Sequence, residues 1–399
     1  MNKKDLTNKF KGDIALWIAI FFLCGYSVVA VYSGIAMKTS SAEYLDLMRH
    51  LFIIIIGLVL MWGVHLIKWH NALQKASVTL LIISWLLLIL TIFFGEESAE
   101  SKRRLDLIIF TVQASDIAKV MLIIYVSTIF AKIEEYEKDF KKMLKWVYAP
   151  VGITCALIVK DNNSTAILLF AIVVLLMFFA RISMKKIATM TGIFMAAVVA
   201  LLLTLSVAKA VMGSEKNVSD NRLDTLVSRV TKFFKPTEPG SEEYKAQVAI
   251  SGGGLVGMKP GQGNQRYSLA NMDTDYIFAI IVEEYGLLFG AIPIIVLFLI
   301  LTFRGVKIAL NSSRRFSAYL VLGITFMYVF QAFINIGVSV DCLPVTGQPM
   351  PFVSKGGSMF IMCCIAFGLV LSESRVNAEE QIAKELAEII DETEITEVS

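Results

Sequence analysis

The feature that most constrains the fold is a series of apolar runs of bilayer-spanning length, or nearly so. Hydrophobic residues make up 56% of the 399-residue chain and charged residues 18%, with a mean hydropathy of +0.68. Too little polar surface remains to cover a soluble globule, and a spanning helix needs about 20 mostly apolar residues. We therefore predict an all-α polytopic membrane protein with ten transmembrane helices. Their expected positions are 14–37, 51–67, 76–94, 107–131, 146–160, 164–180, 187–212, 276–303, 316–340 and 350–372.

The distribution of Lys and Arg predicts the orientation of these helices. Lys3, Lys4, Lys9 and Lys11 precede the first run in the charge order of a signal sequence. That run is much longer than the apolar core of a signal peptide, about 7–15 residues, so we expect a retained first span. With the N-terminus inside, short inner segments carry more than twice as many Lys and Arg as short outer ones. Both termini are therefore predicted to be cytoplasmic.

The predicted helices form one transmembrane domain over residues 1–372. The long segment 213–274, between helices 7 and 8, is then an extracytoplasmic loop. Residues 373–399 hold nine acidic and two basic side chains, a net charge of 2 − 9 = −7. They predict an acidic cytoplasmic tail, either solvated or, from the helical spacing of its apolar residues, a helix that docks on a partner or lies at the membrane interface.

Charge and cysteine usage exclude several classes of protein. The net charge is 37 − 34 = +3, without a basic stripe, so no nucleic-acid partner is expected. The five cysteines mostly lie in or beside apolar runs, with neither CxxC nor His spacing. We interpret them as packing residues and expect neither a structural disulfide nor a zinc site.

Polar and charged side chains inside predicted spans are costly unless they are paired or line a wet cavity. In the first such cluster, Gln113, Asp116 and Lys119 lie three residues apart along one side of a helix. Two interpretations stay open. The Asp116–Lys119 pair can neutralise itself and hold a neighbouring helix, or Lys119 can bind the phosphate of a lipid head group together with Arg103 and Arg104.

Two further clusters flank predicted helices on the outer side. The stretch 160–165, KDNNST, is typical of a tight turn in which Asn or Ser caps the next helix. Asp275 is the last polar residue before a long apolar helix, and Glu283 lies about 12 Å deeper on a related face. Asp275 could be a plain helix cap or a general base at the membrane boundary, with Glu283 tuning a polar cavity below it.

Two glycine-containing segments stand out. Gly252, Gly253 and Gly254 allow a close backbone approach, or else form a flexible turn. Residues 335–360 contain three prolines and three glycines after Gly337. Broken backbone inside a bilayer is tolerated only where protein buries it or where it lines a cavity. This segment predicts a kinked or re-entrant structure beside a substrate cavity, with a structural kink as the alternative.

Several motifs, in order along the chain, are similar to those of the SEDS family of membrane proteins, which includes FtsW, RodA and SpoVE. KRRLDLIIFTVQASDIAK resembles the family's Arg-Arg-Trp segment followed by Gln-Pro-Ser-Glu-x-x-Lys, with Asp116 in place of Glu. KDNNSTA resembles Pro-Asp-x-Gly-Thr-Ala, and YKAQVAISGGGLVG resembles the family's Gly-Gly loop. TDYIFAIIVEEYG and LPVTGQPMPFVSKGGS are close matches, and the N-terminal segment is more similar to FtsW-type than to RodA-type proteins.

The resemblance implies a peptidoglycan glycosyltransferase that polymerises lipid II, in the bacterial inner membrane and at the division septum. It also implies a single-span class B penicillin-binding protein and other division proteins as partners, and Asp275 as the essential acid. An exposed aspartate, with an ordinary pKa of about 3.9, is ionised at neutral pH and can act as a base. The alternatives are a RodA-type elongation polymerase, a lipid II flippase, and a scaffold that only recruits a synthase.

The implied reaction needs a base, a cationic clamp for the leaving pyrophosphate and a groove open to lipid. A divalent cation, Mg or Mn, is a candidate cofactor, without assigned ligands. The residues expected to bind substrate are Arg103, Arg104, Gln113, Ser115, Lys119, Asp161, Gln247, Ser251, Gly252, Gly253, Glu283, Pro344, Thr346, Gly347, Ser354, Gly356 and Gly357.

Overall fold

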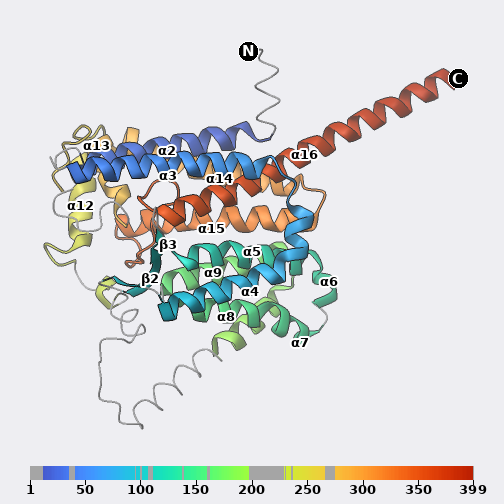
Figure 1. The fold of residues 1–399 in the computed structure, drawn as a ribbon, viewed down its shortest axis with the longest axis horizontal. Helices are drawn as coiled ribbons and strands as arrows, with labels where there is room; N and C mark the ends of the chain where they lie inside the picture. Colours follow the sequence, from blue (N-terminus) through green and yellow to red (C-terminus); the bar gives the residue numbers. More distant parts are fainter. Residues whose placement is uncertain are drawn as a thin grey trace, which may run out of the picture.

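The protein is a helical bundle in this computed structural model (Figure 1). The structure describes residues 12–35, 41–94, 96–98, 101–106, 111–136, 139–159, 162–196, 229, 231–234, 237–265 and 275–398. All helices, strands, contacts and distances of the fold and the site belong to these residues.

The N-terminal half contains most of the predicted spans as helices, joined by short connections. In chain order the elements are α2 (Ile14–Ile35), α3 (Ser41–His65), α4 (His70–Phe94), β1 (Glu96–Ser98), β2 (Ser101–Asp106), β3 (Thr111–Val112), α5 (Ala114–Ala131), α6 (Ile133–Tyr136), α7 (Phe140–Met143), the π-helix η1 (Leu144–Tyr148), α8 (Ala149–Val159) and α9 (Asn163–Phe179).

The C-terminal half begins with a helix in the long loop and ends with the longest helix of the chain. Its elements are α12 (Glu242–Gly253), α13 (Ile277–Gly286), the π-helix η4 (Leu287–Ala291), α14 (Ile292–Leu310), α15 (Arg315–Ser339) and α16 (Gly357–Val398). Figure 1 shows α2, α3 and α14 on one side of the bundle, α4, α8 and α9 on the other, and α15 between them.

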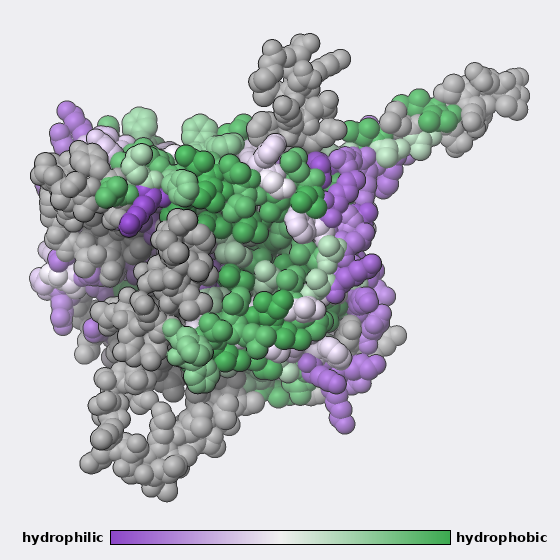
Figure 2. Space-filling view, in the orientation of Figure 1, coloured by the Kyte–Doolittle hydropathy of each residue, from purple (hydrophilic) through white to green (hydrophobic). Residues whose placement is uncertain are grey.

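Eight helical segments among the described residues are long and apolar enough to cross a membrane, and α9 is a shorter apolar helix of 17 residues. Apolar side chains form a broad band on the visible face, and hydrophilic ones gather at the end where α6 and α7 lie (Figure 2). The described chain is thus a multi-pass helical membrane protein, as predicted. Most of the predicted span 187–212 lies outside the described residues, which include it only to 196.

The most buried spans contain α5, α15 and α16, whose most apolar windows are 78%, 72% and 89% buried. Helices α5 and α15 also carry buried polar side chains, among them Asp116, Lys119 and Asn335. A polar group in a bilayer protein is stabilised by facing other helices instead of lipid. The burial of these helices therefore places the polar side chains inside the bundle.

Several predicted boundaries differ from the structure. The segment before Ala114, expected to begin a helix at 107, holds part of a three-stranded antiparallel sheet with the order β1-β2-β3, which was not predicted. Residues 350–356 are not helical, and α16 begins only at Gly357. The acidic tail continues α16 as one helix of 42 residues, about 63 Å long, which projects from the bundle in Figure 1.

Candidate active site

Asp275 lies at the start of α13, partly buried and facing the turn at Gly347. A Cβ atom placed on Gly347 would be 3.7 Å from Oδ2 of Asp275 and 3.9 Å from Nδ2 of Asn162. Gly347 has φ +62°, a conformation that costs glycine little. The carboxylate therefore lies against a glycine, which carries no side chain, between α13 and the N-terminus of α9.

A chain of amide hydrogen bonds fixes the backbone around Asp275. Nδ2 of Asn335, a buried residue of α15, donates to the carbonyl oxygens of Asp275 at 2.9 Å and of Gln348 at 2.8 Å. Nε2 of Gln348 donates to Oγ1 of Thr165 at 2.6 Å. These bonds join α13, α15, α9 and the irregular segment before α16, so Asp275 is positioned by four parts of the chain.

The predicted cap at the start of α9 is confirmed, and it joins the same network. Oδ1 of Asn162 accepts from the backbone N–H groups of Ser164 at 2.9 Å and Thr165 at 3.3 Å, as an N-cap does. Its Nδ2 donates to the carbonyl oxygen of Gly347 at 3.3 Å. One side chain therefore caps a helix and holds the turn that faces Asp275.

Tyr276 directly follows Asp275 and directly precedes the apolar span Ile277–Leu310. Burial raises the pKa of its phenol, and the nearby carboxylates of Glu243 and Glu242 raise it further. Because both effects keep the phenol neutral at physiological pH, Tyr276 is a poor proton acceptor. Asp275 is the better candidate for a base at this position.

The loop that follows α12, beginning at Gly254, forms backbone hydrogen bonds where the helix after Asp275 is interrupted. Gly286 has φ +71° and ends α13, which leaves backbone groups without helical partners. The N–H groups of Met258 and Lys259 donate to the carbonyl oxygens of Glu283 and Glu284 at 3.0 and 3.1 Å. The N–H of Leu287 donates to the carbonyl oxygen of Gly254 at 3.0 Å. The loop thus satisfies broken backbone that a bilayer would not tolerate.

Glu283 fastens the same loop with its side chain. Its carboxylate is 1% exposed, and Oε1 accepts from the N–H groups of Asn264 at 2.7 Å and Gln265 at 3.0 Å. The side chain of the adjacent Glu284 accepts from the hydroxyl of Ser33 on α2. Glu283 therefore holds the loop through Oε1, and its predicted contact with substrate stays a prediction.

Gly253 is the point of closest approach between the loop and α13. A Cβ atom there would be 2.0 Å from the carbonyl oxygen of Val282, which is backbone and cannot move aside cheaply. Gly253 therefore packs against the helix, and its predicted contact with substrate stays a prediction. The side chain of Gln247 likewise donates to Oδ2 of Asp341 at 2.6 Å, so it ties α12 to the end of α15.

We expect Gly253→Ala to destabilise the protein by about 1–3 kcal/mol, the usual cost of overpacking. Gly252→Ala is the matched control, because its Cβ would meet only the flexible end of Met258 at 3.3 Å. Both glycines lie in α12, where alanine is the better helix former. Thermal unfolding of the purified variants should show a lower melting temperature for Gly253→Ala only. Equal melting temperatures would contradict the close approach.

The second candidate cluster is the buried ion pair of α5. Nζ of Lys119 lies 2.9 Å from Oδ1 of Asp116, and both side chains are at most 7% exposed. Oδ2 of Asp116 accepts from the hydroxyl of Ser358 at 3.0 Å, and that hydroxyl accepts from the backbone N–H of Gln113 at 3.1 Å. The predicted pair is confirmed, and it contacts the start of α16.

One irregular segment, residues 344–356, connects the two clusters along the chain. It meets Asp275 at Gly347 and leads to Ser358, the partner of Asp116. Two side chains bind the backbone of this segment. Nε2 of Gln331, on α15, donates to the carbonyl oxygen of Pro349 at 2.9 Å, and Oγ of Ser354 accepts from the N–H of Met350 at 2.7 Å. The predicted break in the helix is confirmed here, and the substrate cavity beside it stays a prediction.

The other predicted site residues are distributed unevenly around these clusters. Arg103 and Arg104 lie on β2, whose side chains are not described, and Asp161 lies outside the described residues. Ser251 is exposed, and its hydroxyl donates to the carbonyl oxygen of Val248 at 3.0 Å. Ser115 is 1% exposed in α5. The predicted site residues that are partly buried in the irregular segment or at the start of α16 are Pro344, Thr346, Gly347, Gly356 and Gly357.

Sequence reasoning missed the residues that hold Asp275 in place. Asn335 and Gln348 belong to a segment that the sequence marked as irregular, but nothing in their spacing indicates which carbonyl oxygens they contact. Asp341 has φ +58° and accepts hydrogen bonds from Gln247 and from Thr237. Its only signal in the sequence is an acidic residue at the end of an apolar run.

Comparisons with curated proteins find relatives along nearly the whole chain. A probable peptidoglycan glycosyltransferase FtsW of Bacillus subtilis is 28% identical over 373 residues, covering 91% of this chain and 90% of the relative. One of the same description from Coxiella burnetii is 29% identical over 378 residues, covering 89% and 94%.

Solved structures share the fold. A chain from a structure described as "structural coordination of polymerization and crosslinking by a peptidoglycan synthase complex" has a TM-score of 0.66 at 20% identity, covering 91% of this chain and 98% of that one. The rod shape determining protein RodA of Thermus thermophilus has a TM-score of 0.61 at 20% identity, covering 91% and 97%. The family model FtsW/RodA/SpoVE, described as cell cycle protein, matches residues 14–379. The predicted resemblance is therefore confirmed, and the chain belongs to the FtsW/RodA/SpoVE family.

Proposed function

We propose that this protein is a peptidoglycan glycosyltransferase that polymerises lipid II, with Asp275 as the general base. The observation that carries the proposal is the position of Asp275, at the start of a membrane helix and against Gly347, which carries no side chain. Relatives described as peptidoglycan glycosyltransferases, which match about nine-tenths of the chain, support the activity.

In the proposed step, the 4-hydroxyl of one disaccharide attacks the anomeric carbon of a glycan chain linked to polyprenyl pyrophosphate. Asp275 takes the hydroxyl proton as the new C–O bond forms. The bond to pyrophosphate breaks, and the leaving group departs with the electron pair. No second catalytic acid is needed, since pyrophosphate is already a good leaving group. Lys119, with Arg103 and Arg104, is proposed to stabilise its charge.

The divalent cation suggested by the sequence finds no ready-made site in the described part of the chain. No group of three or more His, Cys, Asp or Glu side chains gathers among the residues that the structure describes. The divalent cation therefore stays a prediction, and no step of the proposed mechanism passes through one.

The membrane arrangement belongs to the same proposal. We propose ten spans with both termini in the cytoplasm, a transmembrane domain over 1–372, the loop 213–274 on the outer side and the acidic tail from 373 inside. The single-span class B penicillin-binding protein is the proposed partner, and the membrane of the septum is the proposed location. The FtsW description of the relatives supports a division role, and the synthase complex among the structural neighbours supports a partner.

The decisive experiment measures polymerisation and transport by the same preparation. Purified protein and its partner are given labelled lipid II in detergent, where no membrane needs to be crossed, and the products are separated by length. We expect glycan polymer. In parallel, protein in sealed vesicles is tested for movement of labelled lipid II between leaflets. Transport in vesicles without polymer in detergent would favour the flippase. The absence of both activities from a preparation that lacks a synthase would favour the scaffold.

A further inference from the structure

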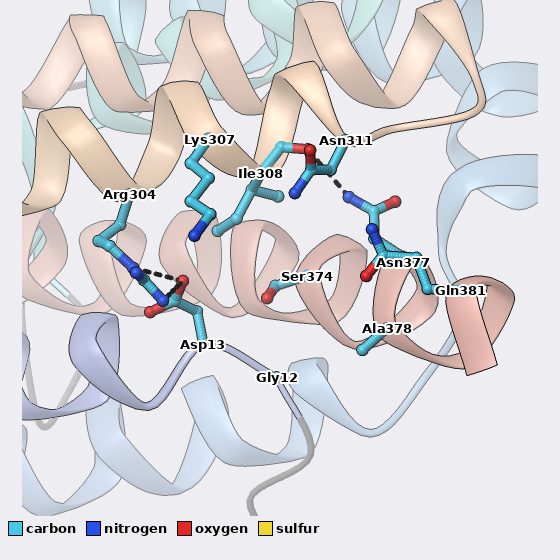
Figure 3. A pocket seen from close by; sticks show the side chains of 10 residues that line it. All are labelled: Gly12, Asp13, Arg304, Lys307, Ile308, Asn311, Ser374, Asn377, Ala378 and Gln381. Atoms are coloured by element: carbon cyan, nitrogen blue, oxygen red, sulfur yellow. Dashed lines mark hydrogen bonds and ion pairs between the residues drawn. The ribbon is translucent and has the colours of Figure 1, made fainter. Parts of the chain in front are cut away.

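A polar pocket lies at the opposite end of the bundle from Asp275, between the start of α2, the end of α14 and the middle of α16 (Figure 3). Its volume is about 210 Å³. By the predicted orientation, this end faces the cytoplasm. The pocket is separate from both clusters of the proposed active site, so its function does not depend on the proposed reaction.

The two cations of the pocket differ in their partners. Arg304 is neutralised, because its Nε and a terminal nitrogen lie 2.6 and 2.5 Å from Oδ2 of Asp13. Oδ1 of Asp13 accepts from the backbone N–H of Leu16 at 3.1 Å, so this carboxylate is fully used. Lys307 points into the pocket one turn further along α14, and no described carboxylate pairs with it. The pocket therefore carries a net charge of +1 (Arg304 and Lys307 against Asp13).

Neutral donors line the rest of the pocket. The hydroxyl of Ser374 and the amides of Asn311 and Gln381 border the space near Lys307 (Figure 3). Asn377 is held in place, since its Nδ2 donates to the carbonyl oxygen of Ile308 at 2.9 Å and its Oδ1 accepts from Ser312 at 3.2 Å. An ammonium group with hydroxyl and amide donors suits a phosphate anion, which accepts several hydrogen bonds.

The surface of α14 indicates where such a phosphate comes from. Lys307 lies four residues after Phe303 and three before Leu310, so the three share one side of the helix. The side chains that continue this exposed apolar stripe, each 45–79% exposed, are Ile292, Val296, Leu299, Phe303 and Leu310. In a membrane helix such a stripe faces lipid chains. Lys307 therefore lies where a phospholipid on this stripe places its head group.

We propose that this pocket binds the phosphate of an anionic phospholipid in the leaflet at this end of the bundle, with Lys307 as the principal charged contact. The acyl chains of the lipid lie along the exposed stripe of α14. Because α2, α14 and α16 all border the pocket, the bound lipid bridges the first, eighth and last predicted spans.

Native mass spectrometry of the purified full-length protein, titrated with phosphatidylglycerol or phosphatidylcholine, tests the proposal. We expect saturable binding of phosphatidylglycerol. Its affinity should be about tenfold lower in Lys307→Gln, because this variant loses one charge-assisted contact. Lys307→Arg should keep the wild-type affinity. Lys141→Gln is the matched control, because Lys141 is an exposed lysine of α7 elsewhere at the same end.

Three outcomes would overturn the proposal. Unchanged phosphatidylglycerol binding by Lys307→Gln would exclude the pocket, and equal loss in Lys141→Gln would show only non-specific attraction to basic residues. Inorganic phosphate that binds as tightly as phosphatidylglycerol and displaces it would identify a soluble anion as the ligand. The melting temperature of each variant in lipid-free detergent separates loss of the lipid from loss of the fold.

Discussion

Replacing Asp275 with Asn should reduce lipid II polymerisation by about 10²–10⁴-fold, the usual contribution of a general base. The amide has nearly the same shape as the carboxylate but cannot accept the hydroxyl proton. Asn335 contacts the backbone of Asp275, so that hydrogen bond is unaffected by the substitution. The measurement is the initial rate of polymer formation from labelled lipid II, at saturating substrate and with the partner present.

Controls separate lost chemistry from lost structure. Asp139→Asn makes the same chemical change at the other end of the bundle, where Oδ1 of Asp139 accepts from the N–H of Lys141 at 2.9 Å. Asn is an equally good cap, so this variant should keep the wild-type rate and melting temperature. Polymer formation by Asp275→Asn within a few-fold of wild type would exclude Asp275 as the base.

The spans were predictable because hydropathy reflects what a lipid bilayer requires of the chain that crosses it. A chain crossing lipid must satisfy its backbone within the helix, so long apolar runs and helices coincide at α2, α4 and α15. Hydropathy fails where backbone is satisfied by other means. At Thr111 and Val112 the backbone pairs with β2 as a strand, and at 350–356 side chains such as Ser354 accept the backbone donors that a helix would have used.

The candidate site was predictable as a set of unusual residues, but its connections were not. Asp275, Asp116 and Lys119 stand out because charges near or inside a bilayer are costly. The α5 pair follows from a spacing of three residues. By contrast, the bond from Asn335 to Asp275 spans 60 positions, and the bond from Gln348 to Thr165 spans 183. Such contacts depend on how helices pack, which periodicity within one helix does not encode.

Glu283 has structural contacts that its position in the sequence does not indicate. A carboxylate eight residues after Asp275 at membrane depth suggested a polar cavity, which stays a prediction. The structure shows that the helix ends three residues later and that the returning loop presents N–H groups to the carboxylate. The signal for this arrangement was present in Gly253 and Gly286, but only the meeting of two distant segments reveals it.

Breaking the buried ion pair of α5 has the second large expected effect. Lys119→Met should lower the free energy of unfolding by about 3–5 kcal/mol, because it leaves the carboxylate of Asp116 buried without its cation. Ser358 still donates to that carboxylate, but one neutral hydrogen bond does not replace a charge at 2.9 Å. Thermal unfolding of the purified variant should show a markedly lower melting temperature.

The double variant Asp116→Asn/Lys119→Met distinguishes the two interpretations of this pair. Removing both charges relieves the unpaired carboxylate, so the double variant should recover most of the lost stability, as replaced buried pairs often do. If the pair only holds α5 to the start of α16, polymerisation recovers with the melting temperature. If Lys119 also stabilises the leaving pyrophosphate, the double variant folds but stays inactive, and we expect this second result. Recovery of both would contradict a role for Lys119 in the reaction.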